Sequence, residues 1–368
     1  MRHASAQAGR ERILWTRSRD LARRAQDVHD VRAAGRLLWQ EGLIDDVLLA
    51  GGRPWCTGLA IAREALAGVW PEGDLALSVT GLGITPLLLA GNGTAPVEEA
   101  RRAKALWAFA LTEPNAGSDP AGMEAAAVRD GPGFRIDGEK RFISLAGDAL
   151  FLTVFARLSA AEKPSAFLVR REQDGVRTQL RENLGDHPVY AVQLDGAHAE
   201  AMVGDAGQGL ALAYGTLALF RPSVGAQGIG IGREALRLSL ARARERRQFG
   251  RPIGEFGEVQ GLLVESYLRL LAARAVVRQA AQLLDQGAPA AELSSAAKLL
   301  GTEAGFQAAD AAVAVFGGAG VLEGSPALRL FALSRAPRLY EGANELQRHL
   351  IARWLLRQDD PFEEGRHD

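Results

Sequence analysis

Residues 134–144 read Phe-Arg-Ile-Asp-Gly-Glu-Lys-Arg-Phe-Ile-Ser, within a segment of short runs and turns that begins near residue 107. Asp137-Gly138 stands between two short runs, which is a strong hairpin signal, so strands are predicted over 134–136 and 140–144. Further short runs bounded by turn residues follow at 151–155, 166–169 and 189–194. This spacing predicts a small antiparallel β-domain over residues 107–204.

Helical periodicity lies on both sides of this segment. Before it, apolar positions recur at three-to-four spacing, as in Leu37-Leu38-Trp39. After it, long helices are predicted over 258–286 and 290–316, the second ending at Gly317-Gly318. The first of these places one apolar stripe along Val259, Leu262, Leu263, Tyr267, Leu270 and Leu271. The fold class is therefore α+β multidomain, with an N-terminal α-helical domain (1–106), a middle β-domain (107–204) and a C-terminal α-helical bundle (205–368).

Composition excludes several classes of protein. The chain has 368 residues, of which 47% are hydrophobic and 24% charged, as in ordinary globular proteins. Because 43 basic residues face 44 acidic ones, no overall field recruits nucleic acid or an anionic membrane. Cys56 is the single cysteine, so no intramolecular disulfide or thiolate zinc cage can form. A reducing compartment follows, and we expect a cytoplasmic protein.

Membrane insertion and metal binding have no support in the sequence. The uncharged stretch 75–97 is long enough to span a bilayer, but Pro86, Asn92 and Pro96 interrupt it. It is predicted to form two short buried helices around a turn, with no membrane span. The start of the chain lacks the apolar core of a signal peptide. The histidines are scattered, without a metal-ligand spacing, so no metal site is predicted.

The glycine-rich run 225–232 does not have the spacing of a dinucleotide-binding loop and does not follow a strand. It is predicted to be a helix whose small residues let another backbone come close.

Residues 109–119 read Phe-Ala-Leu-Thr-Glu-Pro-Asn-Ala-Gly-Ser-Asp. As a plain stretch it is a turn-rich connector, but a loop dense in small residues also exposes backbone N–H groups that can bind carbonyl and phosphate oxygens. The segment resembles the Leu-Thr-Glu-Pro-Gly-Ala-Gly-Ser-Asp signature of the acyl-CoA dehydrogenase family of FAD flavoproteins.

Further motifs resemble this family in the same order along the chain. Lys140–Ser144 is similar to a Trp-Ile-Thr strand beside the flavin, and Gly204–Gly209 to a Gly-Glu-Glu-Gly-Gln-Gly run. Arg246–Ile253 resembles Arg-x-x-Phe-Gly-x-x-Ile, which in the family grips the FAD of a neighbouring subunit. Phe316-Gly317-Gly318 follows, and Tyr340–Gln347 is similar to Tyr-Glu-Gly-Thr-Ser-Glu-Ile-Gln.

The resemblance implies a fold, a cofactor and site residues. The C-terminal part should be a four-helix bundle, with FAD between the middle and C-terminal domains at a subunit interface. The residues that the resemblance assigns to FAD are Phe109, Thr112, Ser118, Phe142, Ser144, Arg246, Phe249, Gly317, Gly318, Ala343 and Glu345. Those that it assigns to substrate are Arg221, Tyr340 and Gly342. The expected substrate is an acyl-CoA or a related acyl thioester.

The catalytic base implied by the resemblance is Glu341. Desaturation removes the weakly acidic α-proton, which requires a carboxylate of raised basicity in a dry site. Some family members carry this base just before an arginine on an earlier helix. Here that position is Phe220, before Arg221, which cannot take a proton. The thioester oxygen is polarised in the family by a flavin ribityl hydroxyl and the backbone N–H of the base residue.

Departures from the family pattern keep a second function open. Asn115, Phe142, Ala343, Ala314 and Leu333 all stand where the family has other residues. The first hypothesis is an acyl-CoA dehydrogenase that passes electrons to an electron-transfer flavoprotein. The second is a non-catalytic or half-site subunit of a heteromeric complex, or a dehydrogenase acting on carrier-protein-bound acyl groups.

The bundle helices are rich in alanine, so a lone bundle buries little area, and a homodimer or homotetramer is expected.

Overall fold

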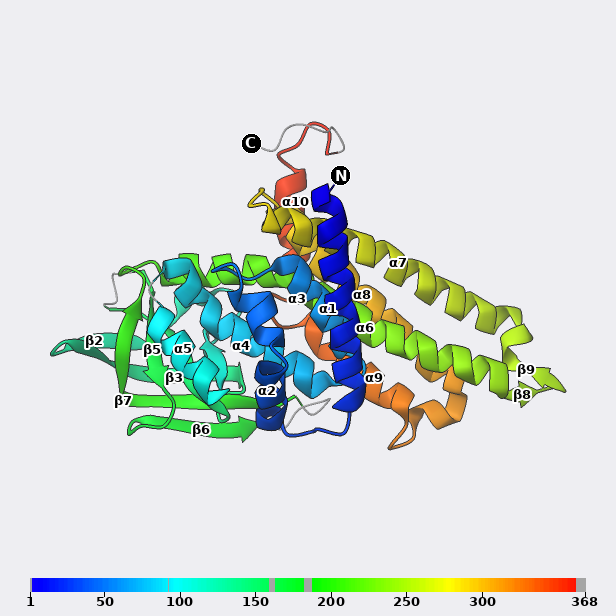
Figure 1. Cartoon of the computed structure of the whole chain (residues 1–368), viewed down its shortest axis with the longest axis horizontal. Coiled ribbons are helices and arrows are strands. Elements are labelled where there is room, and N and C mark those ends of the chain that lie inside the picture. Colours follow the sequence, from blue (N-terminus) through cyan, green and yellow to red (C-terminus); the bar gives the residue numbers. More distant parts are fainter. Residues whose placement is uncertain (1, 92, 159–162, 182–186, 362–368) are drawn as a thin grey trace. The chain divides into compact units, whose positions relative to one another are not determined.

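The computed structural model describes residues 2–91, 93–158, 163–181 and 187–361 (Figure 1). The chain forms two compact units. The helical unit comprises Met1–Arg24, Cys56–Pro71 and Ala218–Asp368, and the sheet unit comprises Ala25–Trp55 and Glu72–Leu217. The predicted N-terminal segment 1–106 is therefore divided between both units, and the division into three consecutive domains stays a prediction.

The sheet unit is built on a mixed sheet. Its strands are β1 (Leu106–Ala110), β2 (Ala126–Asp130), β3 (Gly133–Ser144), β4 (Ala149–Ala156), β5 (Ser165–Arg170), β6 (Val176–Arg181) and β7 (Val189–Val203). They lie in the order β1-β4-β5-β7-β3-β2, with β6 also paired to β7. β1 pairs with β4 in parallel and the other pairs are antiparallel, so the prediction of a purely antiparallel domain was wrong. Between β1 and β4 the chain forms β2 and β3 at the other edge of the sheet, and it then returns to place β4 beside β1.

The hairpin predicted at Asp137-Gly138 is also wrong, because β3 runs through it as one strand. The pairing with β7 shifts register between Ile136 and Gly138, which makes this position a bulge. Gly138 has φ +148° there, and a Cβ at this residue would lie 2.7 Å from the Cβ of Ala125. Asp137 accepts a hydrogen bond from the Gly196 backbone N–H at 2.7 Å. The reversal of the chain lies instead between β2 and β3, at residues 131–132.

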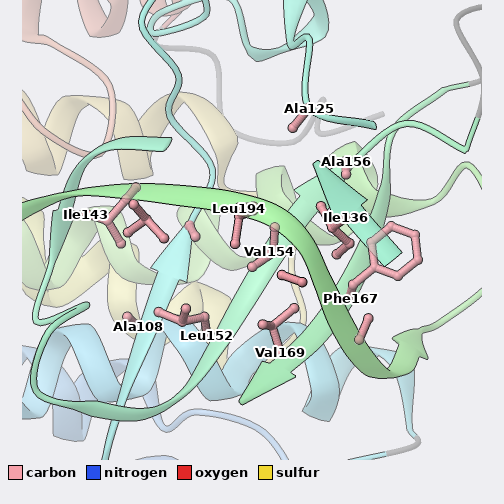
Figure 2. Packing of buried hydrophobic residues seen from close by; sticks show 14 of the residues in the cluster. Ala108, Ala125, Ile136, Ile143, Leu152, Val154, Ala156, Phe167, Val169 and Leu194 are labelled. Atoms are coloured by element: carbon pink, nitrogen blue, oxygen red, sulfur yellow. The ribbon is translucent and has the colours of Figure 1, made fainter. Parts of the chain in front are cut away.

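Apolar side chains from β1, β3, β4, β5 and β7 form the buried core of this unit. Figure 2 shows Ile136, Leu152, Val154, Phe167 and Leu194 pointing into this core, and each is at most 1% exposed. Helices α2 (Val31–Gln40), α4 (Pro71–Ala90) and α5 (Thr94–Ala103) belong to this part of the chain.

The apolar stretch forms two helices around a turn, as predicted, but the first of them, α4, has 20 residues and is not short, and the second is the start of α5. α4 continues through Pro86, and residues 73–87 are all buried, so burial outweighs the helix-breaking tendency of proline. Asn92 lies outside the described residues. Two helical segments are long and apolar enough to cross a membrane, but 83% of the α4 window and 39% of the Ala291–Val321 window are buried within the protein. Core helices satisfy the same criterion, and the absence of a span stays a prediction.

The helical unit contains the long helices predicted from the sequence. Its main elements are α1 (Arg2–Arg24), α3 (Cys56–Leu66), α6 (Gly209–Glu245), α7 (Gly257–Asp285), α8 (Ala291–Phe316), α9 (Pro326–Arg335) and α10 (Asn344–Leu355), and α6 contributes residues to both units. A two-residue hairpin, β8 (Arg247–Gln248) and β9 (Arg251–Pro252), joins α6 to α7. α8 ends at Phe316 with Gly317 at φ +64°, as the Gly317-Gly318 signal predicted.

The glycine-rich run 225–232 forms part of α6 and lies directly against α8. A Cβ at Gly228 would lie 2.5 Å from the carbonyl oxygen of Gly301, and one at Gly301 would lie 2.5 Å from the Cα of Gly225. The prediction of closely approaching backbones is confirmed.

The apolar stripe predicted on α7 is only partly buried. Leu270 is 4% exposed and packs in the bundle core, whereas Tyr267 and Leu271 are 54% and 50% exposed. α7 thus has an apolar surface larger than the bundle of one chain covers.

Candidate active site

The loop at 112–119 follows β1 and is tied to the sheet by a buried ion pair. Lys140 of β3 donates hydrogen bonds to Glu113 at 2.7 Å and to the carbonyl oxygens of Leu111 and Phe155 at 3.2 and 2.5 Å. Glu113 also accepts from the backbone N–H groups of residues 124 and 125. The ion pair therefore joins the start of the loop to the sheet and to the two residues just before β2.

Burial is the dominant electrostatic effect at Lys140. Its side chain is 0% exposed and that of Glu113 is 4% exposed. Burial lowers the pKa of Lys140 to about 8, while the charge of Glu113 and its hydrogen bond act in the opposite direction. Sequence reasoning did not assign either residue a role, although both lie within the quoted motifs.

The sheet unit also carries four of the residues predicted to bind a flavin, on the loop after β1 and on β3: Thr112, Ser118, Phe142 and Ser144. The Arg141 N–H donates to the carbonyl oxygen of Thr112 at 2.9 Å, which fixes Phe142 beside the loop. Phe142 is 70% exposed with φ +56°, Ser118 is exposed and Thr112 is half-buried. Ser144 lies farther along β3 and is hydrogen-bonded to His187 at 2.8 Å.

The residues of this surface fit a flavin nucleotide. Thr112 and Ser118 offer hydroxyl groups, which can donate hydrogen bonds to ring carbonyls and phosphates. The Phe142 ring is exposed and apolar, as a partner for a flavin ring would be. Phe109, in contrast, is half-buried on β1 and packs edge-on against Phe155 at 4.9 Å.

In the helical unit, Glu341 lies in a tight turn just before α10. Glu341 has φ +51° and Gly342 has φ +88°, so two consecutive residues occupy the left-handed region. Such a conformation is unfavourable for a glutamate and persists only where the surroundings enforce it. The Oε2 atom of Glu341 is buried. The turn therefore holds a partly buried carboxylate in a conformation that it would not adopt in a free chain.

Two donors enforce the turn through one backbone atom. The carbonyl oxygen of Gly342 accepts from Lys298 Nζ at 2.9 Å and from Gln347 Nε2 at 2.9 Å. Lys298 also donates to Asn344 Oδ1 at 2.7 Å. Lys298 is fully buried on α8, and Asn344 is 1% exposed at the start of α10.

Lys298 was missed by the sequence reasoning. The signal that could have found it is a single charge in the run Ala296-Ala297-Lys298-Leu299-Leu300. Burial, with a smaller effect of the positive charge of Arg221, lowers the pKa of Lys298 to about 7. The negative charges of Glu341, Glu345 and Glu303 act in the opposite direction.

The residues predicted to bind substrate lie around the same turn. Tyr340 donates its hydroxyl to Gln227 of α6 at 2.6 Å, and Arg221 of α6 is near enough to act on Lys298. Ala343 caps the start of α10, and Glu345 lies in its first turn. The helical unit thus brings together Arg221, Tyr340, Glu341, Gly342, Ala343 and Glu345.

The remaining predicted residues lie at the other end of α6. Arg246 follows the last turn of this helix, and about 24 residues at 1.5 Å per residue separate it from Arg221 by roughly 36 Å. Phe249, at the tip of the β8–β9 hairpin, is 94% exposed with φ +47°. Figure 1 shows this hairpin at the end of α6 and α7 that lies away from α10. One chain therefore does not bring Arg246 and Phe249 to its own Glu341.

Gly317 and Gly318 belong to this distal end as well. α8 runs alongside α6 in the same direction, since Gly225 meets Gly301 and Gly232 meets Gly305. At the ends of both helices, Arg242 lies over the ring of Phe316 at 5.4 Å. Both glycines are exposed and directly follow Phe316.

The sequence matches two family models. The acyl-CoA dehydrogenase middle domain matches residues 108–197, and the acyl-CoA dehydrogenase C-terminal domain matches residues 207–356. Together they span more than half of the chain.

Individual relatives agree with these models. The chain is 33% identical to a cyclohexane-1-carbonyl-CoA dehydrogenase of Geobacter metallireducens, over 88% of each chain. It is 32% identical to an acyl-CoA dehydrogenase of Bacillus subtilis, over 75% of this chain and 76% of the relative. Among solved structures, a glutaryl-coenzyme A dehydrogenase in complex with glutaryl-CoA has a TM-score of 0.86, with 25% identity and 98% of each chain covered. Butyryl-CoA dehydrogenase from Megasphaera elsdenii has the same fold, with a TM-score of 0.87, 24% identity, and 94% of this chain and 98% of that chain covered.

Proposed function

The chain belongs to the acyl-CoA dehydrogenase family, and from that premise we propose that it desaturates an acyl thioester between the α- and β-carbons, with Glu341 as the base. The family relationship makes it an FAD-dependent oxidoreductase. The observation that carries the assignment of Glu341 is the enforced turn at residues 341–342, which holds a carboxylate with one buried oxygen. Strained backbone of this kind is concentrated at functional sites.

Glu341 would take the α-proton onto a carboxylate oxygen. A carboxylate shielded from water is a stronger base than one at the surface, because burial disfavours its charged form. Tyr340 and Arg221, which lie on either side of the turn, would orient the thioester. Phe220, the residue before Arg221, is fully buried and apolar, so it offers no alternative base.

The FAD cofactor would be held by the sheet-unit surface around Thr112, Ser118 and Phe142. When bound, FAD accepts the β-hydrogen as hydride. The loop hydroxyl and N–H groups would bind flavin acceptors, and the Lys140–Glu113 ion pair would keep the loop from moving. The donor chemistry of the loop supports this assignment.

A second copy of the chain would complete each site. Arg246 and Phe249 lie roughly 36 Å along α6 from the residues around Glu341, so we propose that they contact the FAD of a neighbouring subunit. The apolar side chains exposed on α7 would be covered in the same assembly. We propose a homodimer or homotetramer, and light scattering on the FAD-bound protein tests it. A monomer that retains FAD would contradict this proposal.

We also propose an electron-transfer flavoprotein as the electron acceptor and the cytoplasm as the location. An acyl-CoA is the substrate class that the relatives support, because the names of the most similar ones specify acyl-CoA compounds.

The test of Glu341 is anaerobic reduction of the FAD-bound protein by a panel of acyl-CoA thioesters. Glu341→Gln should retain FAD, and its rate of flavin reduction should fall by two to four orders of magnitude, because only proton abstraction is removed. In the control variant Glu323→Gln, which changes an exposed residue of the same unit, the flavin should be reduced at the parent rate. Reduction of Glu341→Gln at the parent rate would refute the assignment.

A further inference from the structure

We propose that Lys298 is a positioning residue for the Glu341 base, which it serves by fixing the left-handed turn and by placing a positive charge opposite the carboxylate. The inference rests on the proposed function, in which Glu341 removes the α-proton.

The contacts of Lys298 reach the turn from one face of α8. Thr302 and Glu303 lie about one helical turn after Lys298, and all three bind Asn344. Asn344 accepts from Lys298 at 2.7 Å and donates to Glu303 at 2.8 Å and to Thr302 at 3.0 Å. With the bond to the Gly342 carbonyl, the ammonium group is held to both sides of the turn, and so the turn is held to α8.

The charge of Lys298 can be followed by titration. A buried lysine can lose its proton near neutral pH, which an arginine does not, and the chain has only four lysines, Lys104, Lys140, Lys163 and Lys298, among 43 basic residues. The described charges that act on Lys298 are those of Glu303 on α8, Glu345 on α10, Arg221 on α6 and Glu341 in the turn.

The attraction between Lys298 and Glu341 must act on both groups equally. The Glu341 charge raises the pKa of Lys298 against the effect of burial. By the same energy, a charged Lys298 favours the carboxylate form of Glu341, the form that can accept a proton. Glu303 contributes less to this balance, because Arg338 and Arg348 also pair with it at 3.1 and 3.4 Å.

The first experiment measures this coupling without any turnover. The FAD-bound protein is produced with lysine labelled with ¹³C at the ε-carbon, and each lysine signal is followed from pH 5 to pH 10. With only four lysines, single Lys→Arg replacements of Lys104, Lys140 and Lys163 identify the other three signals and leave Lys298 as the fourth. In Glu341→Gln the Lys298 titration should move to lower pH, whereas in Gln347→Met, which removes a neutral donor to the same carbonyl, it should stay in place. An unmoved Lys298 titration in Glu341→Gln would overturn the inference.

The second experiment compares Lys298→Met with Gln347→Met in flavin reduction by substrate. Each variant removes one 2.9 Å donor to the Gly342 carbonyl, but only Lys298→Met removes a charge. When the rate of flavin reduction is plotted against pH, its fall on the acidic side should move to higher pH by about one unit in Lys298→Met. At a given pH on the acidic side, the rate should then be roughly tenfold lower than in the parent. Gln347→Met should lower the rate without moving this fall. Equal pH profiles in the two variants would overturn the inference.

The outcomes separate the inference from the function on which it rests. If Glu341→Gln still reduces its flavin at the parent rate, the assignment of the base is wrong. If Glu341→Gln is inactive while the Lys298 titration is unmoved, the base stands and the role of Lys298 is wrong. The NMR measurement on Glu341→Gln leaves Lys298 intact, so it holds even where Lys298→Met does not fold.

Discussion

Replacing Gly228 by alanine should destabilise the helical unit, because it fills a space that α8 already occupies. The added Cβ would lie 2.5 Å from the carbonyl oxygen of Gly301 and 2.8 Å from the Cα of Thr302. Both are backbone atoms, so no side chain can turn away. Since Cβ contacts under 3.0 Å are essentially never seen, α6 and α8 must separate by at least about 0.5 Å.

Two opposing free-energy terms decide the magnitude. Alanine is favoured over glycine in a helix by about 1 kcal/mol. Overpacking of a close helix contact costs about 1–3 kcal/mol, and the upper end applies here because Gly225 and Gly301 are also in contact and move together. The expected net loss in the free energy of unfolding is therefore about 2 kcal/mol.

The assay is urea unfolding followed by circular dichroism at one protein concentration, with Gly261→Ala as the matched control. Gly261 lies inside α7 and is exposed, and a Cβ there would point into open space, so alanine should gain about 0.5–1 kcal/mol. The same chemical change should thus have opposite signs at the two sites. If Gly228→Ala is as stable as Gly261→Ala, the close approach of α6 and α8 is not as described.

Three further perturbations test the site. Arg246→Ala should lose FAD on extensive dialysis, because a charge-assisted hydrogen bond is worth about 1.5–3 kcal/mol; equal flavin occupancy in variant and parent would contradict its role. Lys140→Met should lower the free energy of unfolding by about 3 kcal/mol, because it leaves Glu113 as a buried, uncompensated charge. Thermal melting measures this loss, and the double variant Lys140→Met with Glu113→Gln shows how much of it is due to the charge of Glu113. Because burial lowers the pKa of Lys298 to about 7, the unfolded chain holds this proton up to about pH 10.5 and the folded chain does not. Lys298 should therefore add a rise in the free energy of unfolding between about pH 7 and 10.5, of at most about 1.4 kcal/mol per pH unit. In pH-dependent urea titrations, Lys298→Met should remove this contribution and leave the rise that Lys140 adds above about pH 8.

The parts of the fold that the sequence predicts well are those set by local pattern. The helices α7 and α8 and the stop at Gly317 follow from periodicity and one glycine signal. The strand β2 was not predicted because it is short and mostly exposed, with only Ala127 buried. Asp137-Gly138 misled for a related reason: the pair is typical of a tight turn, but pairing with β7, some 60 residues away, holds it extended.

The candidate site divides along the same lines. Glu341 and Thr112 were identified from motifs that are continuous in the chain. The contacts of Lys298 join residues more than 40 positions apart, and so its burial beside the turn depends on how α8 packs. The roughly 36 Å between Arg246 and Arg221 likewise appears only once α6 is known to be one continuous helix.

The discontinuous make-up of the helical unit has a consequence for synthesis on the ribosome. α1 and α3 contact each other and can pair early, but α7, which contacts α3, is made much later. Glu11 of α1 forms its 3.2 Å ion pair with Arg278, which lies 267 residues downstream. At about 5–20 residues per second, that partner arrives roughly 13–53 s after Glu11 is made. A nascent chain therefore carries the α1–α3 pair without its α7 partner through most of its translation.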